Sequence, residues 1–222
     1  MEASLREILK KSKAILFDLD GVVIDSDSLH DEAKKATLRY YGFKTPDFDW
    51  GKIKNHSISQ IYEWLCLKDP KIKVTENEFV AYKREYFSKF AESKIKLVPN
   101  VLVFVNFLKE QGIRTALVTA TSRVAFDFFY KKFDLSKYFE VFITGNDVKN
   151  LKPDPEAYLK AVNLLGLEPK NCVVIEDSPI GVQSGKSAGC FVVGRESTVS
   201  KNVLLRAGAN AVFKDFVEVN IF

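Results

Sequence analysis

Short apolar runs recur along this 222-residue chain, and helix-like stretches separate most of them. Runs of this length and character are typical of strands buried on both faces of a sheet. Their alternation with helices predicts an α/β fold with a Rossmann-like, doubly wound parallel sheet. The predicted strands are Ala14–Phe17, Arg114–Val118, Val141–Ile143, Cys172–Ile175, Phe191–Val193 and Ala211–Phe213.

Three helices between these strands have recognisable ends. Each begins at a residue suited to a helix start, and a glycine suited to a helix end follows some ten residues later. Two of the starts stand next to a proline inside the first turn. The starts are Asn100 (after Pro99), Asp154 (before Pro155) and Ser178 (before Pro179), and the ends are Gly112, Gly166 and Gly189.

Residues 28–98 interrupt the alternation. They contain helix-like stretches at 31–41, 59–67 and 76–92, with no convincing strand between them. This pattern predicts an all-helical cap domain, 28–98, inserted into a Rossmann-like core formed by residues 1–27 and 99–222. The two ends of the insert, near 25–29 and 96–99, would then lie side by side as a two-stranded hinge.

Composition excludes several classes of protein. The 33 Lys and Arg residues exceed the 29 Asp and Glu residues by only four, and no basic tract is interleaved with aromatic residues, so nucleic acid is not expected as a partner. Cys66, Cys172 and Cys190 are scattered, which disfavours a zinc site or a disulfide framework. No secretion signal or membrane-spanning run stands out, so we expect a cytoplasmic protein that acts away from membranes.

Polar side chains gather where an open α/β sheet places its site, beyond the carboxyl ends of the strands. One such carboxylate is usually a helix cap or a surface group, but here four separate segments converge on one edge. Asp18 and Asp20 share a face of an extended segment, and two such anions repel each other unless a cation lies between them. The full set is Asp18, Asp20, Thr119, Lys152, Glu176 and Asp177.

The chemistry of this set favours phosphoryl transfer. A carboxylate-rich, all-oxygen pocket suits a hard cation such as Mg²⁺. Lys152 and the hydroxyl of Thr119 supply the opposite character, because both can donate to an anion. A metal, an anion clamp and a free carboxylate are what phosphoryl transfer requires.

The chain resembles the haloacid dehalogenase (HAD) superfamily, most closely its β-phosphoglucomutase-like branch with a helical cap. The likeness runs from about Lys13 to Val219 and rests on four motifs in the family's order and spacing. These motifs are Asp18-Leu19-Asp20-Gly21-Val22, Leu117-Val118-Thr119, Lys152-Pro153 and Ile175-Glu176-Asp177-Ser178.

The resemblance implies a role for each core residue. Asp18 would be the nucleophile and a Mg²⁺ ligand, and Asp20 would be the general acid and base, offering its backbone carbonyl to the metal. Asp177 would ligate the metal directly, and Glu176 would either ligate it or order a bound water. Dehalogenases resemble this pattern but lack the second acid, because a halide needs no proton to leave. Asp20 therefore favours phosphoryl chemistry.

The same resemblance implies a binding site for the transferring phosphoryl group. Thr119 and the backbone N–H of Ala120 would hold its oxygens, and Lys152 would neutralise charge on Asp18 and on the phosphate. The expected partner is a small phosphomonoester, and a monomer is expected because a mobile cap works without a second subunit.

Substrate contacts are expected from the cap. His30 lies at the spacing at which relatives place a histidine that meets the acid/base aspartate on closure, although a plain helix histidine is the alternative. Ser57 matches a turn of the family, whereas Ile58 stands where mutases carry a phosphate-gripping arginine, and Asn55 stands for a glycine. Lys83 offers a cationic contact, or else is a solvated helix lysine.

Three functions follow from these predictions. A Mg²⁺-dependent phosphatase that works through an aspartyl-phosphate is the reading favoured by the complete set of motifs. A β-phosphoglucomutase-type phosphosugar mutase is weakened by Ile58, because a mutase must hold a bisphosphate while it reorients. A non-catalytic, phosphometabolite-binding or regulatory protein would be expected to have lost Asp18, Asp20 or an acidic ligand.

Overall fold

A computed structural model describes residues 5–43, 50–53, 56–68 and 72–219 of the chain. The chain divides into two compact units, one formed by the residues up to Ile24 and from Leu97 onward, the other by Asp25–Lys96. The sequence places these boundaries after residues 27 and 98. We call the first of these two units the core unit and the second the helical unit.

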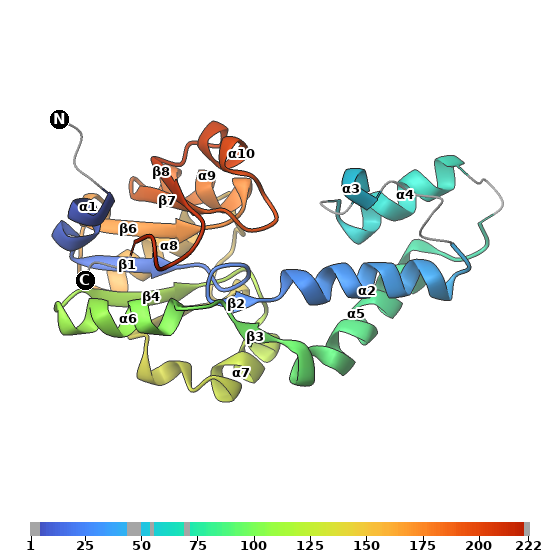
Figure 1. Cartoon of the computed structure of the whole chain (residues 1–222), viewed down its shortest axis with the longest axis horizontal. Helices are drawn as coiled ribbons and strands as arrows, with labels where there is room; N and C mark the ends of the chain where they lie inside the picture. The colour runs from blue at the N-terminus through green and yellow to red at the C-terminus, as the bar shows by residue number, and fades with distance from the viewer. Residues whose placement is uncertain (1–4, 44–49, 54–55, 69–71, 220–222) are drawn as a thin grey trace. The chain divides into compact units, whose positions relative to one another are not determined.

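The core unit is built on a six-stranded parallel sheet in the order β5-β4-β1-β6-β7-β8, which confirms the predicted doubly wound architecture (Figure 1). β1 lies inside the sheet, between two strands that come much later in the sequence. The strands are β1 Ala14–Phe17, β4 Arg114–Val118, β5 Val141–Ile143, β6 Cys172–Glu176, β7 Phe191–Arg195 and β8 Ala211–Phe213.

Two strands run further than their apolar residues indicate. β6 includes Glu176 and β7 includes Gly194 and Arg195, because the ladder continues past the last apolar residue. Glu176 lies opposite Gly194, and Arg195 lies opposite Phe213 of β8. The extra residues carry polar groups to the carboxyl edge of the sheet.

Six helices accompany the strands in the described part of the core unit. They are α1 Leu5–Lys11, α6 Val101–Glu110, α7 Arg123–Lys132, α8 Glu156–Leu164, α9 Pro179–Ser187 and α10 Lys201–Arg206. Ser178 caps α9 as predicted, accepting a hydrogen bond from the N–H of Gly181. The predicted start of α8 is one residue early, because Pro155 occupies the cap position while Asp154 accepts from the N–H of Glu156.

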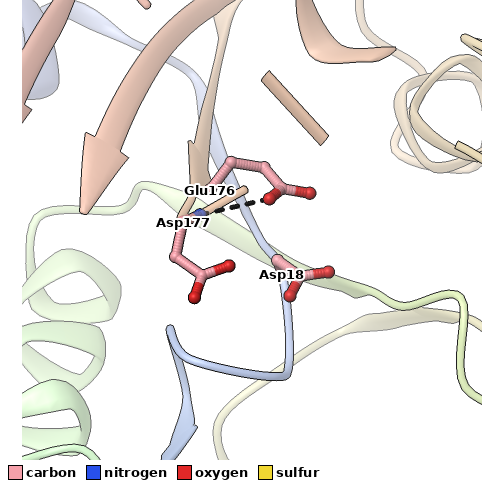
Figure 2. Close-up of side chains that lie close together, drawn as sticks. All are labelled: Asp18, Glu176 and Asp177. Atoms are coloured by element: carbon pink, nitrogen blue, oxygen red, sulfur yellow. Dashed lines mark hydrogen bonds between the residues drawn. The ribbon is translucent and has the colours of Figure 1, made fainter. Parts of the chain in front are cut away.

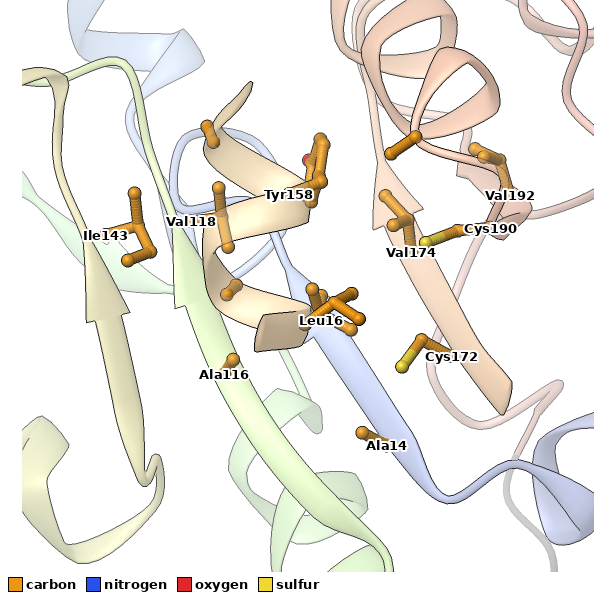
Figure 3. Packing of buried hydrophobic residues seen from close by; sticks show 14 of the residues in the cluster. Ala14, Leu16, Ala116, Val118, Ile143, Tyr158, Cys172, Val174, Cys190 and Val192 are labelled. Atoms are coloured by element: carbon orange, nitrogen blue, oxygen red, sulfur yellow. The ribbon is translucent and has the colours of Figure 1, made fainter. Parts of the chain in front are cut away.

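Side chains of β1 alternate between two hydrophobic layers, which explains why its whole sequence is apolar. Ala14 and Leu16 belong to a cluster with residues of α8, α9 and α10. The cluster also contains Cys172 of β6 and Cys190, which directly precedes β7, and both are core residues as predicted (Figure 3). On the other face the ring of Phe17 meets Phe104 of α6, with ring centroids 6.2 Å apart. The sheet is thereby covered on both sides.

The helical unit contains four helices within its described residues. They are α2 Asp27–Tyr40, α3 Trp50–Ile53, α4 Ile58–Lys68 and α5 Glu76–Lys94. Its own core consists of Leu38, Ile61, Leu65 and Phe79, with partly buried aromatic residues around it. Two short strands at its ends, β2 Ile24–Asp25 and β3 Lys96–Leu97, pair with each other as predicted, and their action as a hinge stays a prediction.

None of the helices in the described ranges combines the length and the apolar character needed to cross a lipid bilayer.

Candidate active site

Three adjacent strands deliver the predicted site residues to one edge of the sheet. Asp18 directly follows β1, Thr119 directly follows β4, and Glu176 is the last residue of β6. Because these strands are parallel neighbours in the order β4-β1-β6, their carboxyl ends meet at the same edge. Residues that lie far apart in the sequence are thus brought together, as the sequence predicts.

An acidic cluster forms at this edge. Carboxylate oxygens of Asp18, Glu176 and Asp177 all lie within 4.8 Å of one another. Figure 2 shows the three side chains gathered around the ends of β1 and β6, with the backbone N–H of Asp177 donating to Glu176. Asp18 and Glu176 are buried, with relative exposures of 8% and 1%. Buried carboxylates this close repel one another, so the cluster needs positive charge.

Lys152 supplies part of that charge. Its Nζ lies 2.5 Å from Oδ1 of Asp18 and 2.7 Å from Oε1 of Glu176, with a side chain only 5% exposed. Burial disfavours the charged lysine, but the two carboxylates outweigh that effect and raise the pKa of Lys152. The ammonium therefore stays charged inside the protein and lies against the predicted nucleophile.

The Asp18 carboxyl remains poorly compensated in spite of Lys152. Burial raises the pKa of Asp18 well above its usual value, Lys152 opposes that shift, and the neighbouring acids Glu176, Asp177 and Asp20 add to it. One ammonium thus faces four acidic side chains. A divalent cation beside Asp18 and Asp177 would offset the remaining repulsion.

Glu176 is saturated by protein donors. Its Oε1 accepts from Lys152 and from the hydroxyl of Tyr158 at 2.8 Å, while its Oε2 accepts from the N–H groups of Asp177 and Ser178 and from the Ser178 hydroxyl. Tyr158, which sequence reasoning missed, is fully buried and also contacts Nζ of Lys152 at 3.0 Å. Nothing in the sequence separates this tyrosine from an ordinary core residue of α8.

Two glycines make room for the acidic side chains. Gly21 has a positive φ of 70°, and a Cβ placed there would lie 1.8 Å from Oδ2 of Asp177. A Cβ on Gly181, in the first turn of α9, would lie 1.8 Å from Oε1 of Glu176. Both distances are far below any real contact, so a Cβ at either position would force the carboxylate beside it to move. The first predicted motif includes Gly21, whereas Gly181 was not singled out from the sequence.

The segment after β4 forms the other side of the site. Thr119 is buried, and its Oγ1 accepts from the N–H of Thr121 at 3.0 Å, which leaves the Thr119 hydroxyl proton available for an anion. The hydroxyl of Thr121 donates to Oδ2 of Asp20 at 3.1 Å. Thr121, which sequence reasoning also missed, joins two of the predicted motifs. Ala120, between the two threonines, is exposed.

Comparison with known proteins agrees with this geometry. A model of the haloacid dehalogenase-like hydrolases matches residues 15–195. The chain belongs to this family. A phosphorylated carbohydrates phosphatase of Thermotoga maritima is 33% identical over 215 residues, which cover 94% of this chain and 97% of the relative. Hexitol phosphatase A of Escherichia coli is 33% identical over 188 residues, covering 82% of each protein.

A solved structure of the same family shares the fold. It is a Thermotoga maritima protein named as a candidate beta-phosphoglucomutase, 33% identical to this chain, with a TM-score of 0.78. The superposition covers 94% of this chain and 97% of that one. The superposition therefore includes residues of both the core unit and the helical unit.

The four predicted substrate residues of this HAD-family chain all lie in the helical unit. His30 and Lys83 contact each other, with Nζ of Lys83 2.7 Å from Nδ1 of His30. The imidazole also stacks on Phe87 at a centroid distance of 4.2 Å. Burial, Lys83 and Lys34 lower the pKa of His30 to about 3. Because an ammonium only donates, the neutral ring accepts at Nδ1 and carries its proton at Nε2.

Ser57 and Ile58 have local structural roles at the start of α4. The Ser57 hydroxyl accepts from the N–H of Gln60, whose side chain accepts from the N–H of Ser57, a reciprocal cap. Ile58 packs against the core of the helical unit. Contact of either residue with a substrate stays a prediction, and Asn55 lies outside the described residues.

The acidic cluster fits the metal that the family resemblance implies. Its donor set is all oxygen, which matches a hard divalent cation such as Mg²⁺. The side chain of Asp20 is not a member of this cluster, and metal binding by its backbone carbonyl stays a prediction. Asp18 and Asp177 are the side chains best placed to hold a cation, because Glu176 is occupied by other donors.

Proposed function

We propose that this chain is a Mg²⁺-dependent phosphatase of small phosphomonoesters that forms an aspartyl-phosphate on Asp18. The observation that carries the proposal is the buried contact of Lys152 with Asp18 inside the acidic cluster. A carboxylate held against an ammonium, beside further cation ligands, is a nucleophile suited to an anionic phosphate.

In the first half-reaction an oxygen of Asp18 attacks phosphorus, and the bond from phosphorus to the substrate's alcohol oxygen breaks. Asp20, held by the Thr121 hydroxyl, gives its proton to the departing alkoxide. The hydroxyl of Thr119 and the N–H of Ala120 receive the phosphoryl oxygens, while Lys152 balances their charge. Mg²⁺, when bound by Asp18, Asp177 and the Asp20 carbonyl, adds further charge stabilisation.

In the second half-reaction Asp20, now a carboxylate, takes a proton from water. The water oxygen attacks phosphorus, and the bond from phosphorus to Asp18 breaks, releasing phosphate and restoring the Asp18 carboxylate. Glu176 serves indirectly in both steps by fixing Lys152 against Asp18. It is not a direct metal ligand in this proposal.

The proposed substrates are sugar or polyol phosphates. Two relatives that align over most of their length are named for phosphorylated carbohydrates and for hexitol phosphates. Mutase activity has one observation in its favour, the name of the similar Thermotoga maritima structure. Against it stands Ile58, which offers no charge for a second phosphate and packs on the helical unit's own core.

The test is phosphate release from a panel of sugar and polyol phosphates, with Mg²⁺ or with excess EDTA. Wild type is compared with Asp18→Asn and with Asp127→Asn, an exposed carboxylate on α7 that serves as the control. We expect Mg²⁺-dependent release that is abolished in Asp18→Asn and unchanged in Asp127→Asn. Mass spectrometry of acid-quenched protein should find the phosphoryl group on Asp18.

Three other results would redirect the assignment. Normal release by Asp18→Asn would refute the aspartyl-phosphate. Conversion of β-glucose 1-phosphate to glucose 6-phosphate in the presence of a bisphosphate primer, without net phosphate release, would establish the mutase instead. Tight binding of a sugar phosphate with neither reaction would establish a non-catalytic protein.

A further inference from the structure

The end of β7 contacts both segments that face the proposed metal. The hydroxyl of Ser197, two residues beyond β7, donates to Oδ2 of Asp177 at 2.7 Å. Arg195, the last residue of β7, donates from its guanidinium to the backbone carbonyl of Gly21. Neither residue belongs to the four motifs. β7 pairs with β6, so its end lies next to the strand that carries Glu176 and Asp177.

One oxygen of Asp177 is confined between two of these elements. Oδ2 receives the Ser197 hydroxyl, and it also lies where a Cβ on Gly21 would stand, 1.8 Å from that position. The hydrogen bond from Arg195 to the Gly21 carbonyl fixes the turn at Gly21. A carboxylate enclosed in this way has little freedom to rotate about its last side-chain torsion, because rotation would break the bond to Ser197 or move Oδ2 against the turn.

Confinement matters because the cluster is repulsive without a cation. A carboxylate oxygen of Asp177 lies within 4.8 Å of carboxylate oxygens of Asp18 and Glu176, the two acids that form ion pairs with Lys152. Loss of the Ser197 donor would allow the Asp177 carboxylate to relieve that repulsion by turning away from Asp18 and Glu176. The Ser197 hydroxyl keeps it facing the cluster before any cation arrives. Donors behind metal ligands generally have this orienting effect.

We propose that Ser197 is a positioning residue for the metal site, which orients Asp177 for Mg²⁺. The inference rests on the proposed function in that it takes the acidic cluster to be the Mg²⁺ site. Ser197 does not touch the metal or the substrate, and acts only through Asp177. Arg195 contributes by fixing the Gly21 turn against which Asp177 rests.

The experiment measures Mg²⁺ binding by calorimetry on the full chain, in the absence of substrate. We expect Ser197→Ala to raise the Mg²⁺ dissociation constant about tenfold to hundredfold. Ser197→Thr keeps the hydroxyl and should restore most of the affinity. Thr198→Ala removes an exposed hydroxyl from the neighbouring residue and should bind Mg²⁺ like wild type.

A melting curve of each variant in EDTA separates orientation from folding. The proposal expects the metal-free melting temperature of Ser197→Ala to match that of wild type, with a smaller rise on adding Mg²⁺. Wild-type Mg²⁺ affinity in Ser197→Ala would overturn the role of Ser197 and leave the phosphatase intact. An equal loss of affinity in Thr198→Ala, or a metal-free melting temperature that falls with the affinity, would overturn it too. If wild type binds no Mg²⁺, the metal assignment itself fails.

Discussion

Replacing Gly181 by alanine sets two physical effects against each other. Gly181 lies in the first turn of α9, where alanine is the better helix former by up to about 1 kcal/mol. A Cβ there would lie 1.8 Å from Oε1 and 1.9 Å from Cδ of Glu176, whereas ordinary contact begins near 3.4 Å. The Glu176 carboxylate would therefore have to move away.

Glu176 cannot move without losing its partners. Its Oε1 bonds to Lys152 and Tyr158 are 2.7 and 2.8 Å long, and both would be stretched or broken. Disrupting a buried charge pair costs about 3–5 kcal/mol. Subtracting the helix-propensity gain of at most about 1 kcal/mol leaves a net destabilisation of roughly 2–4 kcal/mol.

The assay is thermal unfolding in EDTA, followed by circular dichroism. A loss of this size lowers the melting temperature of a protein of this length by about 5–15 °C. Ser187→Ala, an exposed position on the same helix, is the control and should melt at or slightly above the wild-type temperature. If Gly181→Ala also melts at or above wild type, Glu176 relaxes freely and the argument that it is locked in place is wrong.

Two further predictions concern Thr121 and His30. Thr121→Val removes the donor to Asp20 and should lower kcat on a sugar phosphate about tenfold, part of the 10²–10⁴ that general acid–base catalysis supplies, while Thr121→Ser retains it. The loss of rate in the first turnover should be smaller on an aryl phosphate, because its leaving group needs less protonation. Equal losses of rate on the sugar phosphate and the aryl phosphate would contradict the role of Thr121 in orienting the acid. Burial, Lys83 and Lys34 lower the pKa of His30 to about 3 in the folded protein. Below pH 6.5 the imidazole is therefore protonated in the unfolded chain but not in the folded one, so the free energy of unfolding falls as the solution is acidified. Denaturant unfolding should show that wild type loses about 2 kcal/mol more than His30→Gln between pH 7 and pH 5, and parallel losses would show that the imidazole titrates normally in the folded protein.

Most of the fold could be predicted from the sequence because buried parallel strands consist of apolar runs. All six strands of the main sheet lie where those runs predict them. Helices α7 and α10 were not predicted, since neither has the proline start that marks α9, although Ser122 does cap α7. α3 is too short to produce a periodic pattern.

The site was predictable only as far as its chemistry is concentrated in motifs. Asp18 and Lys152 can be recognised in the sequence from their residue type and spacing. Thr121 contacts Asp20 across 101 positions in the sequence, and Ser197 contacts Asp177 across 20, so each depends on a register that only the folded sheet fixes. Gly181 is significant because of a side chain that occupies the space of its missing Cβ, which no local pattern records.

The interior position of β1 sets the order in which the site can be completed. Asp18, the proposed nucleophile, directly follows β1, yet both neighbours of β1, β4 and β6, come about one hundred or more residues later in the sequence. During synthesis, Asp18 therefore gains its contacts with Lys152 and Glu176 only after those residues have been made and β6 has paired with β1. Non-local pairing of this kind makes folding slow, and partially made chains carry the proposed nucleophile without its partners. Phosphatase activity should accordingly appear only once the chain has been made past β7, so that turnover during cell-free synthesis would act as a reporter of the finished sheet.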